Sequence, residues 1–198
     1  KMTTSYQQEK QLIIEIGRRL WLRGMVAAND GNISCRVPGG YLITRSGISK
    51  GFMSEEDILL LDSQGCPLSD GPGQPSSETA MHLGIYQSRP QTGAIIHAHP
   101  PYATAFALAE ADINQAQLEE LRIQLGEVAM IPYAPAGTSE LAQAASTAMA
   151  DKRAGLLLRH GAITVGANLM EALYRIEALE QAAKIVFLSR QLAEGKPL

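Results

Sequence analysis

Residues 94–99 read Ala-Ile-Ile-His-Ala-His, a short apolar run that ends in two of the four histidines of this 198-residue chain. The apolar run predicts a buried strand over residues 93–99. Since side chains i and i+2 of a strand point to the same face, the imidazoles of His97 and His99 can converge on one metal ion. Histidines are also ordinary in protein cores, so this pair alone does not decide between the two interpretations.

A third histidine follows another apolar run. His160 comes after Leu156-Leu157-Leu158-Arg159 and precedes Gly161. We expect it to project from the end of a neighbouring strand toward the same point. Three imidazoles with one open position are the ligand pattern of a catalytic zinc site.

A carboxylate lies near a predicted helix start, in Pro75-Ser76-Ser77-Glu78. Ser76 or Ser77 is predicted to cap a helix that runs from Thr79. Glu78 then lies in the first turn, where a carboxylate is usually only a favourable partner of the helix dipole. His82 lies four residues later on the same helical face, and we interpret it as a buried supporting or packing residue and not as a metal ligand.

The predicted elements favour an α/β fold of three layers. Apolar periodicity and turn residues predict helices over 5–23, 79–86, 102–110, 139–151 and 169–192, and strands over 32–37, 41–44, 58–62, 65–68, 93–99, 128–131, 155–159 and 162–165. Residues 111–126 show no clear pattern. Hairpins with interspersed helices predict a mostly antiparallel central sheet with helices on both faces, and the length predicts one domain over residues 2–198.

Composition excludes several classes of function. The 17 Lys and Arg residues are scattered among 20 Asp and Glu residues, which gives a net charge of -3. This pattern predicts no binding of nucleic acid or of an anionic membrane. No apolar stretch approaches the roughly 20 residues that span a bilayer, and no signal sequence is recognisable, so we expect a cytoplasmic protein. Cys35 and Cys66 have neither metal-site nor disulfide-framework spacing.

Three short segments are suited to binding a small anion. Gly31-Asn32, Ser46-Gly47 and Ser76-Ser77 each combine a polar side chain with exposed backbone N–H groups. Together they are predicted to cradle one phosphate, although each alone is simply a turn or a cap. Lys50 could reach such a phosphate, but we expect a solvated loop lysine there.

Five motifs occur in the order typical of a known family. The segments 28–34 (Ala-Asn-Asp-Gly-Asn-Ile-Ser), 43–47, 75–78, 97–99 and 159–161 together resemble the class II aldolase/adducin family over nearly the whole chain. The resemblance implies zinc held by His97, His99 and His160. It further implies that Glu78 is the fourth ligand in the empty enzyme and the acid/base once substrate displaces it. The implied phosphate site comprises Gly31, Asn32, Ser46, Gly47, Ser76 and Ser77.

The resemblance also implies an activity and an assembly. The expected reaction is zinc-dependent cleavage of a ketose 1-phosphate, through a metal-stabilised enediolate, to dihydroxyacetone phosphate and an aldehyde. L-fuculose 1-phosphate, ribulose 1-phosphate and 5-deoxyribulose 1-phosphate are the expected substrates. The expected assembly is a homotetramer with active sites near subunit boundaries.

Other members of the family leave alternatives open. Ribulose-phosphate 4-epimerases carry Asp where this chain has Glu78, so the glutamate favours aldol cleavage, whereas a methylthioribulose-phosphate dehydratase retains a comparable metal site. Adducin-like heads are interaction modules that lack the metal histidines, all of which this chain has. One departure concerns the general acid: the aldolase that the chain resembles uses a tyrosine from a neighbouring subunit, where this chain has Leu121 or a near neighbour and no tyrosine between Ala111 and Ile131.

Overall fold

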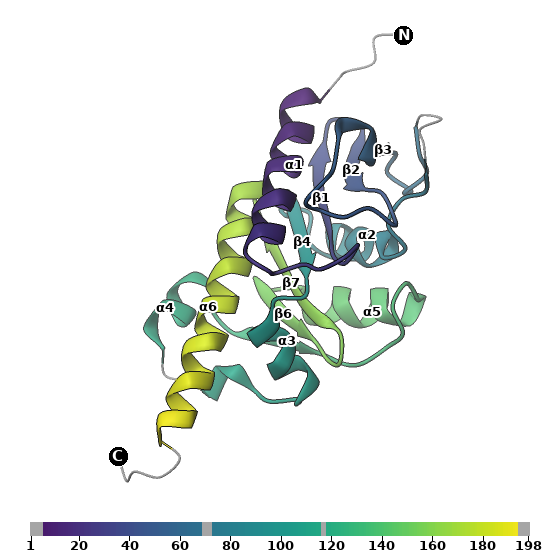
Figure 1. Ribbon diagram of the computed structural model, residues 1–198. Helices are drawn as coiled ribbons and strands as arrows, with labels where there is room; N and C mark the ends of the chain where they lie inside the picture. Colours follow the sequence, from purple (N-terminus) through teal and green to yellow (C-terminus); the bar gives the residue numbers. More distant parts are fainter. Residues whose placement is uncertain (1–5, 69–72, 116–117, 194–198) are drawn as a thin grey trace.

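Two helical layers enclose one seven-stranded sheet in the computed structural model of the protein, which describes residues 6–68, 73–115 and 118–193 (Figure 1). The strands are β1 (Asn32–Val37), β2 (Gly40–Thr44), β3 (Ile58–Leu61), β4 (Ala94–Ala98), β5 (Val128–Ile131), β6 (Ala154–Leu157) and β7 (Gly161–Gly166). Their order in the sheet is β3-β2-β1-β4-β7-β6-β5. All neighbours are antiparallel except β5 and β6, which are parallel. This confirms the predicted fold class.

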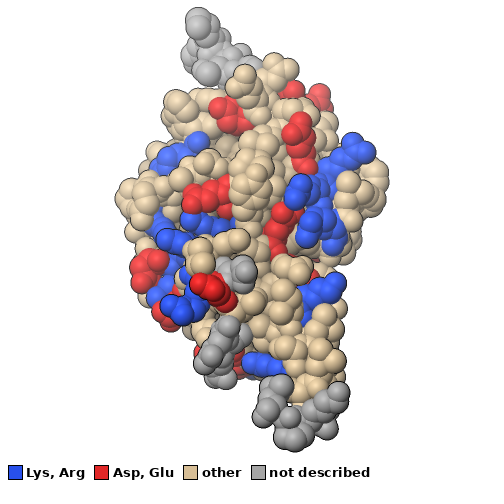
Figure 2. Space-filling model, turned by 90° about the vertical axis from the view of Figure 1, so that its left-hand side faces the viewer, with Lys and Arg blue, Asp and Glu red and all other residues tan. Residues whose placement is uncertain are grey.

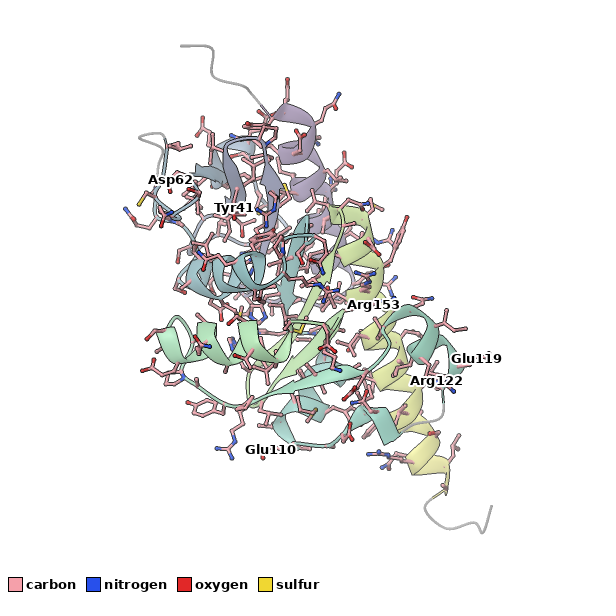
Figure 3. The ribbon with its side chains drawn as sticks, turned by 180° about the vertical axis from the view of Figure 1, so that it is seen from behind. Tyr41, Asp62, Glu110, Glu119, Arg122 and Arg153 are labelled. Carbon is pink, nitrogen blue, oxygen red and sulfur yellow. The ribbon has the colours of Figure 1, made fainter. Side chains whose placement is uncertain are left out.

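The helices divide between the two faces of the sheet. One face is covered by α1 (Gln7–Leu22), α3 (Pro101–Leu108), α4 (Glu119–Gln124) and α6 (Leu169–Ala193), and the other by α2 (Thr79–Ser88) and α5 (Ser139–Ala148). The first group lies in front of the sheet in Figure 1, and α2 and α5 lie in front in the reverse view of Figure 3. Two short 3-10 helices, η1 (Glu55–Asp57) and η2 (Ile113–Gln115), complete the assigned elements of the described residues.

The central strand β4 shows why the chain folds into layers. Its side chains alternate, so that Ala94 and Ile96 pack under α1, α3 and α6, whereas Ile95 joins the core under α2 and α5. Every residue of β4 is buried, because helices cover both of its faces. Full burial of one such aliphatic side chain stabilises the fold by about 1.5–3 kcal/mol. By the same alternation, His97 lies on the face covered by α2 and α5.

Some predicted elements differ from the observed ones. The predicted strand over 65–68 is wrong: only Pro67 forms an isolated bridge, with Leu61. The Asp62 carboxylate accepts hydrogen bonds from the backbone N–H groups of Gln64 and Cys66, at 2.8 and 2.9 Å, and holds this segment as a turn. Proline also lacks the N–H that a strand ladder needs.

Two element boundaries also differ from the predicted ones, and one segment without a predicted element contains two helices. The N-cap of α2 is Glu78 and not Ser76 or Ser77, although the Ser76 hydroxyl accepts a hydrogen bond from the Glu78 N–H at 3.3 Å. The strand predicted over 155–159 ends at Leu157, and Arg159 lies in the turn before β7 with a left-handed φ of 60°. The segment without a predicted pattern, 111–126, contains η2 and α4.

A buried chain of hydrogen bonds connects α2 to β1. The Tyr86 hydroxyl lies 2.8 Å from Ser34 Oγ, which lies 2.7 Å from His82 Nδ1, and His82 Nε2 lies 2.6 Å from Asn32 Oδ1. Asn32 Oδ1 only accepts, so Nε2 carries the hydrogen of a neutral His82 and Nδ1 accepts from Ser34. The Asn32 amide then donates to Glu78 Oε2 at 2.8 Å. As predicted, His82 is a buried supporting residue, and its network holds the side chain of Glu78.

This network predicts a pH dependence of stability. Burial, followed by the nearby His97, lowers the pKa of His82 to about 3, whereas an unfolded imidazole titrates near 6.5. Between these values the unfolded chain binds the extra proton, so the free energy of unfolding falls as the pH falls, by up to about 1.4 kcal/mol per pH unit.

Chemical denaturation of the chelator-treated protein between pH 7 and pH 4.5 measures this slope. We expect His82→Gln to have a shallower pH dependence than the wild type. Equal slopes for the two proteins would contradict the assignment of a neutral buried His82.

Candidate functional site

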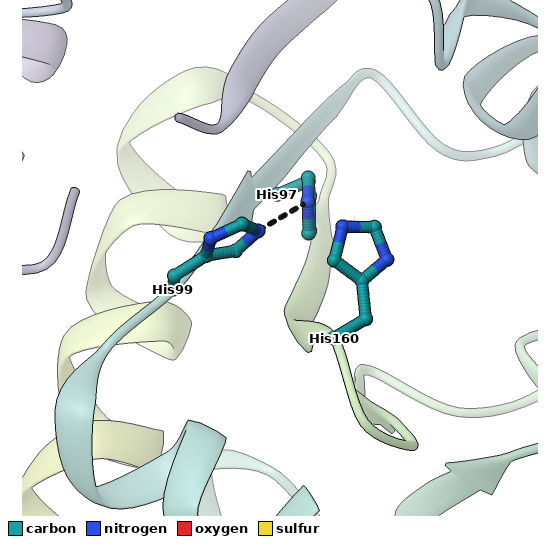
Figure 4. Close-up of side chains that lie close together, drawn as sticks. All are labelled: His97, His99 and His160. Carbon is teal, nitrogen blue, oxygen red and sulfur yellow. Dashed lines mark hydrogen bonds between the residues drawn. The ribbon is translucent and has the colours of Figure 1, made fainter. Parts of the chain in front are cut away.

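Three imidazoles meet at one end of the central strands (Figure 4). His97 lies in β4, His99 follows it directly, and His160 lies in the turn between β6 and β7. The pairing of Ala98 with Ala162 brings that turn beside the end of β4. The three ring centroids are 4.8–5.0 Å apart, and one ring nitrogen of each histidine lies within 4.8 Å of the other two.

The outer ring nitrogens of the strand histidines have acceptors of their own. His97 Nδ1 donates to the Ala162 carbonyl at 2.9 Å, and His99 Nδ1 lies 3.5 Å from a carboxylate oxygen of Asp30. In a neutral imidazole this leaves a lone pair on each Nε2. The two Nε2 atoms nevertheless lie 3.2 Å apart (Figure 4). Two ring nitrogens this close could bind one ion together, and a second hydrogen-bonded ring nitrogen is the usual support of a metal-ligating histidine.

The close approach of the three rings depends on Gly161. A Cβ at this position would lie 2.5 Å from His99 Cδ2 and 2.7 Å from the Ala98 carbonyl oxygen. Both contacts are far shorter than van der Waals distance, and one of them involves backbone. Packing therefore requires glycine after His160, a requirement that the sequence alone does not reveal.

Glu78 completes the donor set. Its side chain is buried, with Oε2 3.2 Å from His97 Nε2 and Oε1 3.6 Å from His160 Nε2. Oε1 has no hydrogen-bond partner among the described residues, and a buried carboxylate oxygen without a partner is costly. Burial works to raise the pKa of Glu78, but the nearby His97, His160 and Asn32 hold it well below its usual value. The carboxylate is therefore ionised.

The protonation states suit metal binding as well. Burial, followed by repulsion from His97, lowers the pKa of His160 to about 4 and lowers the pKa of His99. Neutral imidazole is the form that binds a metal ion. The imidazoles of His97, His99 and His160 and the carboxylate of Glu78 form a donor set that fits a divalent cation of the kind that prefers nitrogen and oxygen ligands, zinc included.

A cavity of about 170 Å³ opens beside this cluster. It is lined by all six residues of the predicted phosphate site, Gly31, Asn32, Ser46, Gly47, Ser76 and Ser77, and by Asn29, Asp30, Arg45, Lys50, Glu78, His99, Ala136 and His160. The loops hold one another: Ser46 N–H donates to the Gln74 carbonyl at 2.9 Å, and Ser76 N–H donates to the Thr44 carbonyl at 3.3 Å. The loop that carries Gly31 packs against the histidine cluster, since a Cβ on Gly31 would lie 2.7 Å from the His97 carbonyl oxygen.

Three charged residues of this cavity escaped the sequence prediction. Lys50, expected to be a solvated loop lysine, is only 2% exposed, which corrects that prediction. Arg45 pairs with Asp57, and Asp30 faces His99. The signal for Arg45 and Asp30 was their place inside the family-like motifs 43–47 and 28–34. Lys50 follows these motifs, and its burial depends on α1, which packs against it from a distant part of the sequence.

The face shown in Figure 2 has no large patch of a single charge, because Lys and Arg side chains lie among Asp and Glu side chains there. A larger groove of about 850 Å³ lies between α4 and α6 and contains none of the predicted site residues. Leu121, the expected counterpart of the family's tyrosine, is 2% exposed and packs in the core. Among the described residues, no helix is both long and apolar enough to cross a bilayer.

Comparison with known proteins agrees with this geometry. The family model described as class II aldolase and adducin N-terminal domain matches residues 11–187. An L-fuculose phosphate aldolase of Methanococcus vannielii is 36% identical over 172 residues, which are 87% of this chain and 92% of the relative. A solved L-fuculose 1-phosphate aldolase superposes with a TM-score of 0.88 at 36% identity, over 96% of this chain and 89% of the other.

Relatives with other named reactions are almost as similar. A 3-oxo-tetronate 4-phosphate decarboxylase of Haemophilus influenzae is 34% identical over 90% of this chain and 87% of its own length. A methylthioribulose-1-phosphate dehydratase of Gluconobacter oxydans is 33% identical over 91% of each chain. The family is thus shown over most of the sequence, and the resemblance predicted from the five motifs is confirmed. The chain belongs to the class II aldolase and adducin family, as one of its lyase-type enzymes.

Proposed function

We propose that this enzyme is a zinc-dependent aldolase that cleaves a ketose 1-phosphate to dihydroxyacetone phosphate and an aldehyde. L-fuculose 1-phosphate, ribulose 1-phosphate and 5-deoxyribulose 1-phosphate are the candidate substrates. The proposal includes a homotetramer with sites near subunit boundaries. The observation that carries it is the convergence of Glu78 with His97, His99 and His160 beside a small polar cavity.

The cavity supports a role in binding the phosphate group. Its loops offer backbone N–H groups at Gly31, Gly47 and Ser77 and hydroxyls at Ser46 and Ser76, which are donors suited to phosphate oxygens. A phosphate in this cavity would hold the sugar carbons next to the histidine cluster. Positioning of this kind is a main source of rate enhancement.

Glu78 is the proposed acid/base. A divalent cation held by the three histidines would supply Lewis-acid stabilisation of the negative charge that develops on substrate oxygens as the carbon–carbon bond breaks. The Glu78 carboxylate, ionised and fixed by the Asn32 amide, is placed to accept and return the proton on the dihydroxyacetone phosphate carbon. No lysine Schiff base is required by this scheme.

A second candidate class is supported by the relatives. Decarboxylation and dehydration occur in the names of proteins 34% and 33% identical to this chain. Epimerisation is a further alternative on the same residues. All four reactions begin by stabilising negative charge next to a carbonyl, so product analysis is the measurement that separates them.

Metal content tests the proposed ligands. Wild-type protein prepared without chelator should contain close to one zinc ion per chain by plasma mass spectrometry, and His97→Ala should lose most of it because three ligands hold zinc far less tightly. Glu119→Gln, at an exposed position of α4 away from the histidine cluster, is the control and should keep its zinc. A wild type without metal, or a His97→Ala variant that keeps it, would contradict the assignment.

Loss of the proposed base should reduce the rate strongly. We expect Glu78→Gln to lower the release of dihydroxyacetone phosphate from a panel of ketose 1-phosphates by about 100- to 10,000-fold, the usual contribution of general acid–base catalysis. Chelator should abolish release by the wild type. Glu119→Gln, on the exposed surface of α4 (Figure 3), should leave the rate unchanged. Absence of dihydroxyacetone phosphate with epimerised, dehydrated or decarboxylated product would replace the aldolase proposal.

A further inference from the structure

A buried cation lines the anion cavity without a carboxylate partner. Lys50 is 2% exposed, and its Nζ donates to the backbone carbonyls of Ile48 at 2.6 Å and Asn29 at 3.3 Å. An ammonium group carries three hydrogens, so these two carbonyls leave one of them without an assigned acceptor. None of the ion pairs among the described residues includes Lys50.

The two carbonyls belong to two different loops of the cavity. Asn29 lies in the loop that carries Gly31, and Ile48 follows the Ser46-Gly47 turn. The backbone of Lys50 is fixed from behind by α1, where a Cβ on Gly17 would lie 2.8 Å from the Lys50 carbonyl oxygen. The ammonium is thus held between the two loops by these hydrogen bonds.

The surrounding charges do not neutralise it. Asp57 forms an ion pair with Arg45, and Asp30 Oδ2 lies 3.5 Å from His99 Nδ1. Burial lowers the pKa of Lys50 to about 8, against the attraction of Asp30 and Asp57. Glu78 and His160, the other titratable groups of the cavity, face the histidine cluster. A buried cation without a counter-ion is unfavourable, and an anion bound in the cavity would relieve that cost.

We propose that Lys50 is the counter-ion of the substrate's phosphate group, and that its free N–H donates to a phosphate oxygen held by the three loops. The ligand class is a phosphate monoester dianion. The inference rests on the proposed function only for the identity of the molecule that bears the phosphate, because binding of phosphate itself does not depend on which bond is later broken.

Lys50→Met separates this role from a purely structural one. Methionine keeps much of the apolar stem but removes the charge and the donated hydrogen bonds. If Lys50 served only to tie the two loops together, its loss would lower the melting temperature. If Lys50 instead serves as the counter-ion of phosphate, removal of this buried cation should leave the melting temperature of the phosphate-free protein unchanged or raise it.

Calorimetric titration of inorganic phosphate into the metal-loaded protein at pH 7 is the test. We expect Lys50→Met to bind phosphate about 10- to 100-fold more weakly, the usual effect of losing a hydrogen bond to a charged group. Lys184→Met, an equal change of net charge at an exposed position of α6, should bind like the wild type. Zinc content measured on each protein verifies that the metal site is intact.

Two results would overturn the inference: no phosphate binding by the wild type, or equal binding by Lys50→Met and the wild type, whatever the melting temperature of the variant. Should Lys50→Met fail to fold, the wild type still provides a test. At pH 8.5 phosphate binding should take up a fraction of a proton as Lys50 becomes fully charged, measured by titration in buffers of different ionisation enthalpy; no uptake would overturn it. Weaker phosphate binding without any aldol cleavage would instead reject only the proposed reaction.

Discussion

The antiparallel pairing of β4 with β7 is the constraint on which the rest of the site depends. It sets Ala98 opposite Ala162, so the turn that carries His160 falls beside the end of the strand that carries His97. A shift of one residue in this register would turn the His97 side chain toward the opposite face of the sheet. Its Nδ1 would then lose the Ala162 carbonyl as an acceptor. The helices on both faces bury β4 completely and thereby hold the register. The convergence of the histidines therefore depends on the packing of the core.

The polar groups beside that cluster form a chain of hydrogen bonds that ends on the Glu78 carboxylate. The Tyr86 hydroxyl donates to Ser34, Ser34 donates to His82, the His82 ring donates to Asn32 Oδ1, and the Asn32 amide donates to the Glu78 carboxylate. Tyr86, Ser34, His82 and Asn32 each have a partner, so this part of the buried network stabilises one arrangement of their side chains. Asn32 therefore serves both the carboxylate and the wall of the anion cavity, and a change there would affect two functions at once.

The sequence predicted the layers, the sheet and the convergence of three histidines, because strand periodicity and apolar runs are local properties of the chain. The strand expected at 65–68 failed because one carboxylate, Asp62, accepts two backbone hydrogen bonds and turns the segment. The burial of Lys50 was missed for a different reason: it depends on the packing of α1 against a loop some thirty residues away. Such long-range packing leaves no mark in the pattern around the lysine itself.

The donor groups come from distant parts of the chain: Glu78 from the start of α2, His97 and His99 from β4 and its end, and His160 from the β6–β7 turn. No pair of neighbouring elements contains all four. They can meet only after the central strands have paired and α2 has packed on the sheet, and contacts between distant residues form slowly. A metal ion bound by all four donors would therefore need the folded central sheet, unlike the metal of small zinc domains, where binding and folding are one step. Binding of a metal by the full donor set would then report that the central sheet of that molecule is complete.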